Sequence, residues 1–204
     1  ILLSDVSAED AHIEAYNILQ KVNLEMSTYI DDSLISKVNK ADIGQWVTVS
    51  QDFLDVLSFA TTLCKDTQGI YDVSIGKLVN LWGFGPDSVD KQPSTEELSY
   101  FSSQVGCNSI ETDPANLSIK KAKDVELDFS SIAKGFALDK VYEFLIKQSY
   151  LNSFFIEVGG EIRSTALKSN DQPWKAGIIN PIQQEKIIYT FLSSDFNTFA
   201  LATS

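Results

Sequence analysis

The segment Leu127–Asp139, LDFSSIAKGFALD, constrains the fold more than any other, because it joins a strand end, a hydroxyl-rich turn and a helix start. Its first three residues alternate like the end of a half-buried strand, and Ser130 and Ser131 can cap a helix. The apolar residues that follow lie near one helical face: Ile132, Phe136, Val141, Phe144 and Leu145. The segment therefore predicts a strand, a turn and an amphipathic helix in direct succession.

The start of this helix suits a bound phosphate. Its first backbone N–H groups lack partners within the helix, and the helix dipole attracts negative charge. Gly135 lets a ligand approach the backbone where a Cβ would block it. A second interpretation fits the same residues, because serines before an amphipathic helix often serve only as caps. The segment by itself leaves both interpretations open.

The rest of the chain divides into helices and then strands. Three further helices are predicted: 8–26 after Ser7, a second from Ser50 to Gly69, and a third from Ser94 and Glu97 to about Gly106. The run Gly69–Pro86 carries four glycines and a proline among apolar residues, and is neither a clean helix nor a clean strand. Strands are predicted at 108–111, 117–120, 125–129, 154–158, 174–179, 187–192 and 198–202. Without a repeat or a linker, the chain is predicted to be one interwoven α+β domain with antiparallel sheets and flanking helices.

Charge and hydropathy exclude two classes of function. The net charge is −12 and the 16 basic residues are scattered, which argues against a nucleic-acid partner. A phosphate ligand would need local compensation by a metal, a helix N-terminus or a lysine such as Lys77 or Lys134. No apolar run approaches the ~20 residues of a membrane helix, so any membrane attachment is expected to lie outside this chain. Because it begins without Met, we expect a mature or trimmed form.

The two cysteines and the one histidine offer little catalytic chemistry. Cys64 and Cys107 lie on different predicted elements without the spacing of zinc ligands. A disulfide is possible in an oxidising compartment, but the apolar surroundings of Cys64 favour a buried free thiol. His12 lies in a polar helix start and is expected to face solvent.

Four segments are candidate walls of a site: 26–29, 70–72, 130–139 and 157–161. Asp72 follows a glycine turn among apolar residues, where a carboxylate needs donors or a ligand to offset its desolvation. Tyr29 is a candidate platform on which a ligand's base could stack, and packing is its alternative role. Gly159 and Gly160 indicate close backbone approach, although a β-bulge would need the same glycines.

Taken in order, the motifs resemble the ApbE family of FAD:protein FMN transferases. They are MSTYIDDSLISKVN, GIYDVSIGKLVNLWGFGP, LDFSSIAKGFALDKV, IEVGGEIRS and PWKAGIINP, which together span nearly the entire chain. The resemblance implies a single domain over 1–204 with a tunnelling-fold-like core that binds FAD and a divalent cation, usually magnesium. It also implies that a Ser or Thr hydroxyl of an acceptor flavoprotein attacks the FMN phosphorus of FAD. AMP then leaves, and FMN stays attached through a phosphoester.

The family pattern can be carried over by position. It implies FAD contacts at Tyr29, Ile70, Tyr71, Asp72, Ser130 and Phe136, with Asp139 reaching the nucleotide ribose. It also implies that the backbone carbonyl of Ala133 binds the metal. Magnesium prefers oxygen ligands, and with the helix-end amides it would neutralise the pyrophosphate without a nucleophilic side chain. The general base is unassigned, and its acidic candidates are Asp72, Asp128 and Asp139. An alternative role for Asp128 is to orient the loop or a ligand on the metal.

The chain also departs from the family pattern. Ser74 stands where Thr is usual and Ala166 where Gly is usual. Compared with the family, we expect the chain to be incomplete at both ends, with the remaining metal ligands beyond Ser204. We therefore expect this length of chain to bind metal weakly and to be incompetent for transfer. The alternatives are a metal-dependent FAD pyrophosphatase, which releases FMN and AMP, and a non-catalytic FAD-binding protein.

Localisation is implied by the resemblance alone. Most such proteins are exported lipoproteins of the bacterial cell envelope, on the periplasmic side of the inner membrane. The lipid anchor would lie outside this chain.

Overall fold

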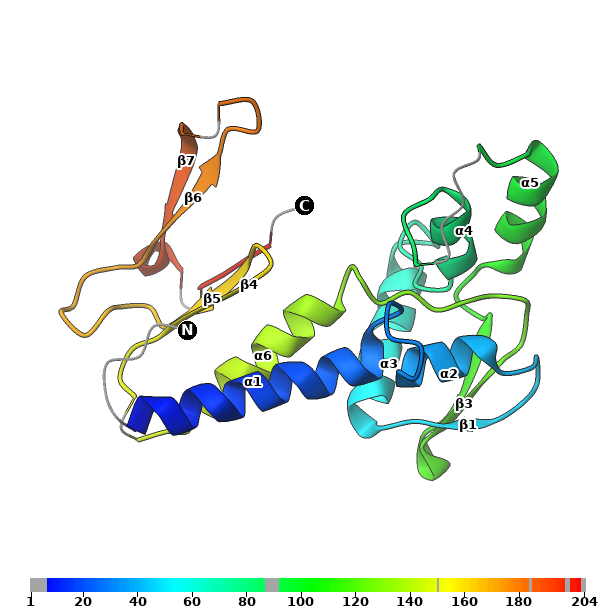
Figure 1. Cartoon of the computed structure of the whole chain (residues 1–204), viewed down its shortest axis with the longest axis horizontal. Coiled ribbons are helices and arrows are strands. Elements are labelled where there is room, and N and C mark those ends of the chain that lie inside the picture. Colours follow the sequence, from blue (N-terminus) through cyan, green and yellow to red (C-terminus); the bar gives the residue numbers. More distant parts are fainter. Residues whose placement is uncertain (1–6, 87–91, 150, 184, 197–198, 203–204) are drawn as a thin grey trace. The chain divides into compact units, whose positions relative to one another are not determined.

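The structure is a computed structural model that describes residues 7–86, 92–149, 151–183, 185–196 and 199–202 (Figure 1). The helices are α1 (Ser7–Met26), α2 (Leu34–Lys40), α3 (Gln51–Asp66), α4 (Gly76–Leu81), α5 (Thr95–Gln104) and α6 (Ala133–Leu145). The strands are β1 (Val47–Thr48), β2 (Ile110–Asp113), β3 (Ser118–Lys121), β4 (Phe155–Val158), β5 (Glu161–Ser164), β6 (Lys175–Ile179), β7 (Ile187–Leu192) and β8 (Phe199–Leu201). Short 3₁₀ turns cover Pro114–Asn116 and Ser193–Asp195. The α+β class with antiparallel sheets is confirmed.

The backbone divides into two compact units. One contains residues 21–133, and the other combines the chain up to Gln20 with the chain from Lys134 onward. The boundary falls at the first residue of α6, so the hydroxyl-rich turn belongs to the 21–133 unit and most of α6 to the other.

The 21–133 unit contains an antiparallel sheet in the order β1-β3-β2, with α3 as its main apolar helix. Ser50 caps α3, because its Oγ accepts from the N–H of Phe53 at 3.0 Å. Phe53 is fully buried, and its ring lies 5.0 Å from that of Phe129. The predicted capping box of α5 is also confirmed, since Ser94 and Glu97 exchange both of their hydrogen bonds.

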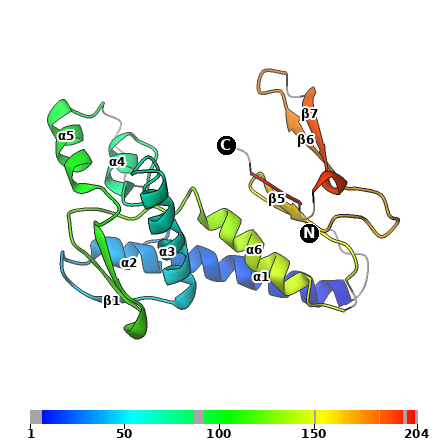
Figure 2. The same cartoon turned by 180° about the vertical axis from the view of Figure 1, so that it is seen from behind.

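The other unit is built on the β4-β5 hairpin. Gly159 and Gly160 form its two-residue turn with φ of 58° and 94°, a left-handed conformation that glycine adopts without strain. The register of this hairpin has no shift, so the β-bulge alternative is wrong. β8 continues this sheet beside β5, and β6 and β7 form a separate ribbon (Figure 2).

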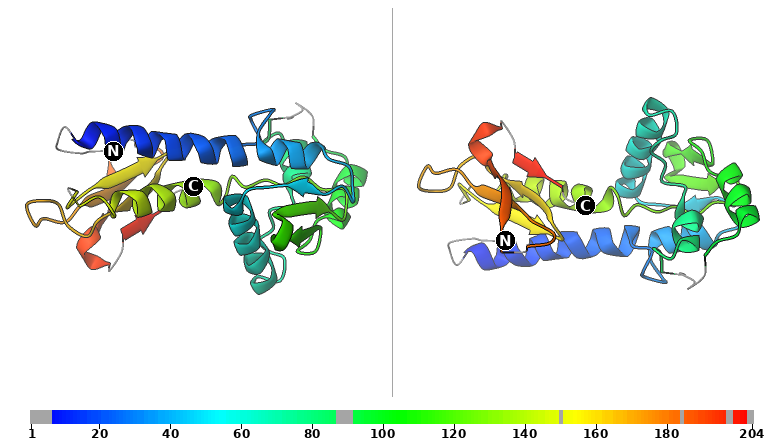
Figure 3. Two further views of the ribbon diagram at one scale, coloured as in Figure 1. Left: turned by 90° about the horizontal axis from the view of Figure 1, so that it is seen from below. Right: turned by 90° about the horizontal axis from the view of Figure 1, so that it is seen from above.

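Helix α6 packs against the N-terminal half of α1, and the two helices lie side by side (Figure 3). The buried residues between them and β4 are Ala11, Ala15, Leu138, Val141, Leu145, Phe154 and Ile156. His12 is exposed, as the sequence predicts.

Several elements differ from their predictions. Within the glycine-rich run, residues 76–81 form the short helix α4, and α2, β1 and β5 have no counterpart among the predicted elements. The predicted strand 125–129 is wrong, since its backbone forms only one bridge, between Glu126 and Ile75, in the described chain. Its burial does not alternate strictly, because Asp128 is buried together with Leu127 and Phe129. Its hydrogen-bond partners come from loops and from a side chain.

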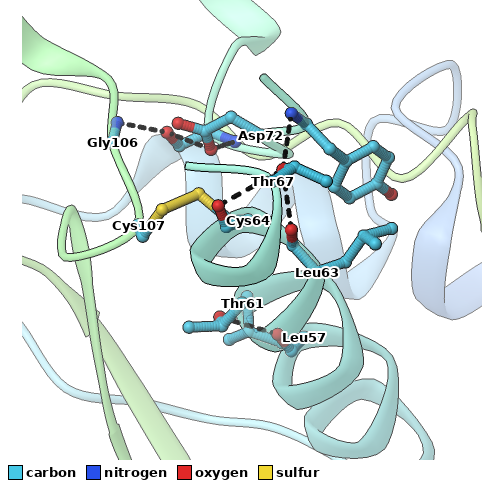
Figure 4. Close-up of a disulfide and its surroundings, with 10 residues drawn as sticks. Leu57, Thr61, Leu63, Cys64, Thr67, Asp72, Gly106 and Cys107 are labelled. Carbon is cyan, nitrogen blue, oxygen red and sulfur yellow. Dashed lines mark hydrogen bonds between the residues drawn. A yellow bond between two sulfur atoms is a disulfide. The ribbon is translucent and has the colours of Figure 1, made fainter. Parts of the chain in front are cut away.

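Cys64 and Cys107 form a disulfide, so the favoured free thiol is wrong (Figure 4). Cys64 lies in the last turn of α3, and Cys107 lies in the loop before β2. The disulfide holds that loop at the end of α3. A second link comes from the N–H of Gly106, which donates to Ser74 Oγ at 3.2 Å. A position 43 residues away in sequence cannot be placed beside Cys64 from local pattern alone.

Candidate functional site

The predicted site segment 70–72 continues into residues 73–76, which lie against the chain that leads into the predicted segment 130–139. The N–H of Gly76 donates to the carbonyl of Glu126 at 2.8 Å, and the N–H of Asp128 donates to the carbonyl of Val73 at 2.8 Å. A Cβ on Gly76 would lie 2.9 Å from the Cβ and the carbonyl oxygen of Glu126, so glycine is required for this approach. The Tyr71 hydroxyl and Ser131 Oγ lie 3.1 Å apart and add a side-chain contact.

The turn before α6 is organised by Asp128. Its Oδ1 accepts from the backbone N–H of Ser130 at 2.7 Å and also from the Ser130 hydroxyl. Ser130 was predicted to cap the helix by accepting a hydrogen bond from a helical N–H. Its Oγ instead donates to the Asp128 carboxylate. Asp128 is 9% exposed, and these two donors offset its burial. The sequence pattern did not identify Ser130 as the donor to Asp128.

Asp72 finds the donors that its apolar surroundings require. Its Oδ1 accepts from the N–H and the hydroxyl of Ser74, each at 2.8 Å. Ser74 Oγ in turn accepts from Gly106, which links the turn to the disulfide (Figure 4). Ser74 thus supplies both the backbone and the hydroxyl donor to Asp72.

A cleft of about 260 Å³ lies in the 21–133 unit. It is lined by Thr28, Tyr29, Asp31, Ser36, Asn39, Lys40, Gly76, Asn80, Pro86, Glu126, Leu127 and Asp128. Tyr29 is 70% exposed, and its hydroxyl donates to the carbonyl of Phe84 at 3.1 Å. Ile70 is 92% exposed, so its side chain contributes little to the core. Of the predicted site residues, Tyr29 and Asp128 face this cleft.

A second cavity of about 250 Å³ lies in the other unit. It is lined by Gly135, Leu138, Asp139, Glu161, Ile162, Arg163, Ala200, Leu201 and Ala202. Asp139 forms an ion pair with Arg163, whose guanidinium lies 4.1 Å from the ring centre of Tyr142. Burial lowers the pKa of Arg163. Phe136, on the same helix, is half-buried under the Lys140 ammonium.

Sequence reasoning missed Arg163 as the partner of Asp139. The signal was present in the motif IEVGGEIRS, where β5 alternates charged and apolar residues after the glycine turn. A Cβ on Gly135 would meet nothing within 4 Å, so the protein itself does not require glycine there. That finding leaves ligand approach as the role that the sequence predicts for Gly135.

The two lysines considered as phosphate partners are both engaged by carboxylates. Lys134 Nζ lies 2.8 Å from Glu161, and Lys77 Nζ lies 2.5 Å from Asp124. The hydrogen bond from Lys77 is the largest of the effects that lower the pKa of Asp124.

Replacing Asp124 by Asn is expected to cost about 0.5–1 kcal/mol at pH 7, because the pair is partly exposed and screened by water. A lowered folded-state pKa means that this stabilisation is complete above the unfolded-state pKa and is lost as the pH falls through the folded-state value. The free energies of unfolding of wild type and Asp124→Asn in urea should therefore begin to converge below about pH 4 and become equal only below the lowered folded-state pKa of Asp124. A difference that stayed constant down to pH 2 would contradict this assignment.

Three comparisons with known proteins place the chain in a family. The model of the ApbE family matches residues 3–204. FAD:protein FMN transferases from Haemophilus influenzae and Vibrio cholerae are 39% and 34% identical to this chain over 180 and 192 residues. These matches cover 86% and 94% of this chain but 52% and 56% of the two relatives. The chain therefore spans little more than half the length of these relatives.

Solved structures agree with the sequence matches. The flavin transferase ApbE from Vibrio cholerae superposes with a TM-score of 0.80 at 33% identity, over 93% of this chain and 60% of that one. The apo flavinyl transferase ApbE from Pseudomonas stutzeri gives 0.78 at 29% identity, over 89% and 58%. Because the family model matches nearly the whole length of this chain, the chain belongs to the ApbE family.

Proposed function

We propose that this protein transfers FMN from FAD to a Ser or Thr hydroxyl of an acceptor flavoprotein. The observation that carries the proposal is the ApbE family match over residues 3–204, together with relatives named FAD:protein FMN transferase. In this reaction the acceptor oxygen forms a bond to the FMN phosphorus, and the bond from that phosphorus to AMP breaks. The hydroxyl proton passes to a base, and FMN remains as a phosphoester.

We propose that Tyr29, Ile70, Tyr71, Asp72 and Ser130, all in the 21–133 unit, form a wall of an FAD site. Phe136 and Asp139, in the other unit, are proposed separately as FAD contacts. The two hydrogen-bonded turns at Asp72 and Asp128 are fixed before any ligand binds, because each carboxylate already holds two donors. Such preorganisation lowers the ordering cost of binding. The large exposed area of Tyr29 is available to a planar ring.

We also propose that transfer requires a divalent cation, usually magnesium, with the Ala133 carbonyl as one ligand. In the part of the chain that the structure describes, no three His, Cys, Asp or Glu side chains gather at one point. Magnesium takes six oxygen ligands in octahedral geometry, several of them usually water, and the described residues do not bring a cluster of three such side chains to the Ala133 carbonyl. No step of the reaction is therefore derived through the metal.

The base is sought among Asp72, Asp128 and Asp139. Replacing each by Asn in the protein at its natural length should separate binding from chemistry. The base variant should lose at least about 100-fold in transfer rate while its Kd for FAD stays within about threefold. A variant that loses FAD binding instead identifies a residue of the binding wall. Assays quenched at successive times measure the rate of transfer, and FAD titrations measure Kd.

The proposed activity is tested by mass spectrometry of the acceptor. With FAD and magnesium, the protein at its natural length should add one FMN mass to a single Ser or Thr. Free FMN and AMP without any acceptor modification would identify an FAD pyrophosphatase. FAD retained in stoichiometric amount without AMP release would identify a binding protein. Either of these results would overturn the transferase proposal.

We further propose that the protein acts in the bacterial cell envelope, on the periplasmic side of the inner membrane, as a lipoprotein. The Cys64–Cys107 disulfide supports an oxidising compartment. Among the described residues, no helix has both the length and the apolar character needed to cross a bilayer. Fractionation of cells followed by detection of acyl-modified protein in the membrane pellet would test this location.

A further inference from the structure

The wall of the cleft is tied to α2 by one side chain. Asn39, near the end of α2, donates from Nδ2 to the carbonyl of Leu127 at 2.9 Å. Its Oδ1 accepts from the N–H of Leu127 at 2.7 Å. One amide thus satisfies both backbone polar groups of a residue that is 88 positions away and fully buried. The Asn39 amide thus makes the two hydrogen bonds that a neighbouring strand would otherwise make to the backbone of Leu127.

The backbone of Asn39 is itself anchored. Lys121, on β3, donates from Nζ to the carbonyl of Asn39 at 2.6 Å. This carbonyl lies in the last turn of α2, where helical carbonyls need partners outside the helix and attract cations. Lys121 is 5% exposed, so it is held by packing as well as by this bond. Lys121, Asn39 and Leu127 therefore form a continuous connection from the sheet to the cleft wall.

The residue after Leu127 is Asp128, which organises the turn before α6. Asn39, Leu127 and Asp128 all line the 260 Å³ cleft. A shift of the Leu127 backbone would move Asp128 and, through it, Ser130. We propose that Asn39 is a positioning residue for FAD. By binding the backbone N–H and carbonyl of Leu127, Asn39 fixes the turn from Asp128 to Ser130. The inference rests on the proposed function, since it assumes that this turn contacts FAD.

The substitution Asn39→Asp tests the inference because it keeps the shape and removes one donor. At pH 8 the new carboxylate can still accept from the Leu127 N–H, but its second oxygen faces the Leu127 carbonyl without a proton. Kd for FAD should rise about tenfold or more relative to wild type. At pH 5 a larger fraction of the introduced carboxyl is protonated than at pH 8, and the protonated form can donate to the Leu127 carbonyl again. The ratio of its Kd to that of wild type should then be smaller at pH 5 than at pH 8.

The charged groups around the cleft are Asp31, Lys40, Glu126 and Asp128, with Lys121 at the backbone of Asn39. They are common to wild type and variant, so each Kd is compared with wild type at the same pH. Val38→Ala is the matched control, because Val38 is a buried neighbour on the same helix that does not line the cleft. It should lower stability and leave Kd for FAD unchanged at both pH values. Asn39→Ser should weaken binding equally at pH 5 and pH 8, because its hydroxyl does not titrate.

The outcomes separate this inference from the proposed function. If wild type binds FAD and folded Asn39→Asp binds equally well at pH 8, the positioning role of Asn39 is wrong and the proposed function stands. Equal weakening by Val38→Ala would reduce Asn39 to a purely structural role. If wild-type protein at its natural length does not bind FAD, both ideas are wrong. Should Asn39→Asp not fold, pH-independent weakening by Asn39→Ser supports the role and unchanged binding overturns it.

Discussion

Replacing Cys64 and Cys107 together by alanine is expected to lower the free energy of unfolding of the 21–133 unit by about 4 kcal/mol. The disulfide closes a loop with a sequence separation of 43, and removing it restores the chain entropy of the unfolded state. Urea unfolding, followed by far-UV circular dichroism, measures the change. Most single-domain proteins have only 5–15 kcal/mol in total, so the effect should be large.

A reducing agent provides the matched control for this experiment. It should destabilise the wild-type protein by a similar amount and leave the double alanine variant unchanged. The single substitutions should each cost as much as the double one, since either removes the cross-link. A wild type that is insensitive to reductant after full reduction, confirmed by thiol titration, would contradict the assigned contribution.

Phe129→Ala is expected to destabilise the same unit by about 3–5 kcal/mol. Phe129 is fully buried, and its ring contacts that of Phe53 at a centroid distance of 5.0 Å. It stands between Asp128 and Ser130 in the sequence, so its truncation also tests whether loss of core packing next to this turn changes FAD binding. Thermal and urea unfolding measure the loss of stability, and an FAD titration at a temperature where the variant is folded measures the effect on binding.

Phe59→Ala is the control for Phe129→Ala. Phe59 is on α3, like Phe53, but its side chain is largely exposed. Its truncation should change the free energy of unfolding by about 0.5 kcal/mol or less. Comparable losses for the two substitutions would show that the 53–129 contact is not part of the core.

Local signals predicted the elements whose chemistry is complete within a few residues. Ser50 caps α3 and Ser94 with Glu97 caps α5, because a capping box needs only four consecutive positions. The apolar face of α6 was predicted only in part, because Val141 and Leu145 are buried as expected whereas Ala137 and Leu138 are buried without having been predicted. Asp72 was correctly expected to need donors, although the sequence did not name Ser74 as their source.

The errors concern contacts between residues far apart in sequence. The pairing of Cys64 with Cys107, of Asp139 with Arg163 and of Asn39 with Leu127 depends on how distant segments come together. Segment 125–129 shows the limit most clearly. Its alternation reported correctly that Leu127 is buried, but burial alone does not specify whether the backbone partner is a strand, a loop or an amide side chain.

The 88-residue separation between Asn39 and Leu127 has a consequence for how the molecule acquires its activity during folding. A contact of this range closes a long loop, so we expect it to form later than the local contacts of α2 and β3. The wall of the cleft should therefore be completed late in folding, after α2 and β3 are in place. A ligand that binds only the finished wall stabilises the native state over every earlier intermediate. Under the proposed function, FAD should therefore raise the free energy of unfolding of the finished protein.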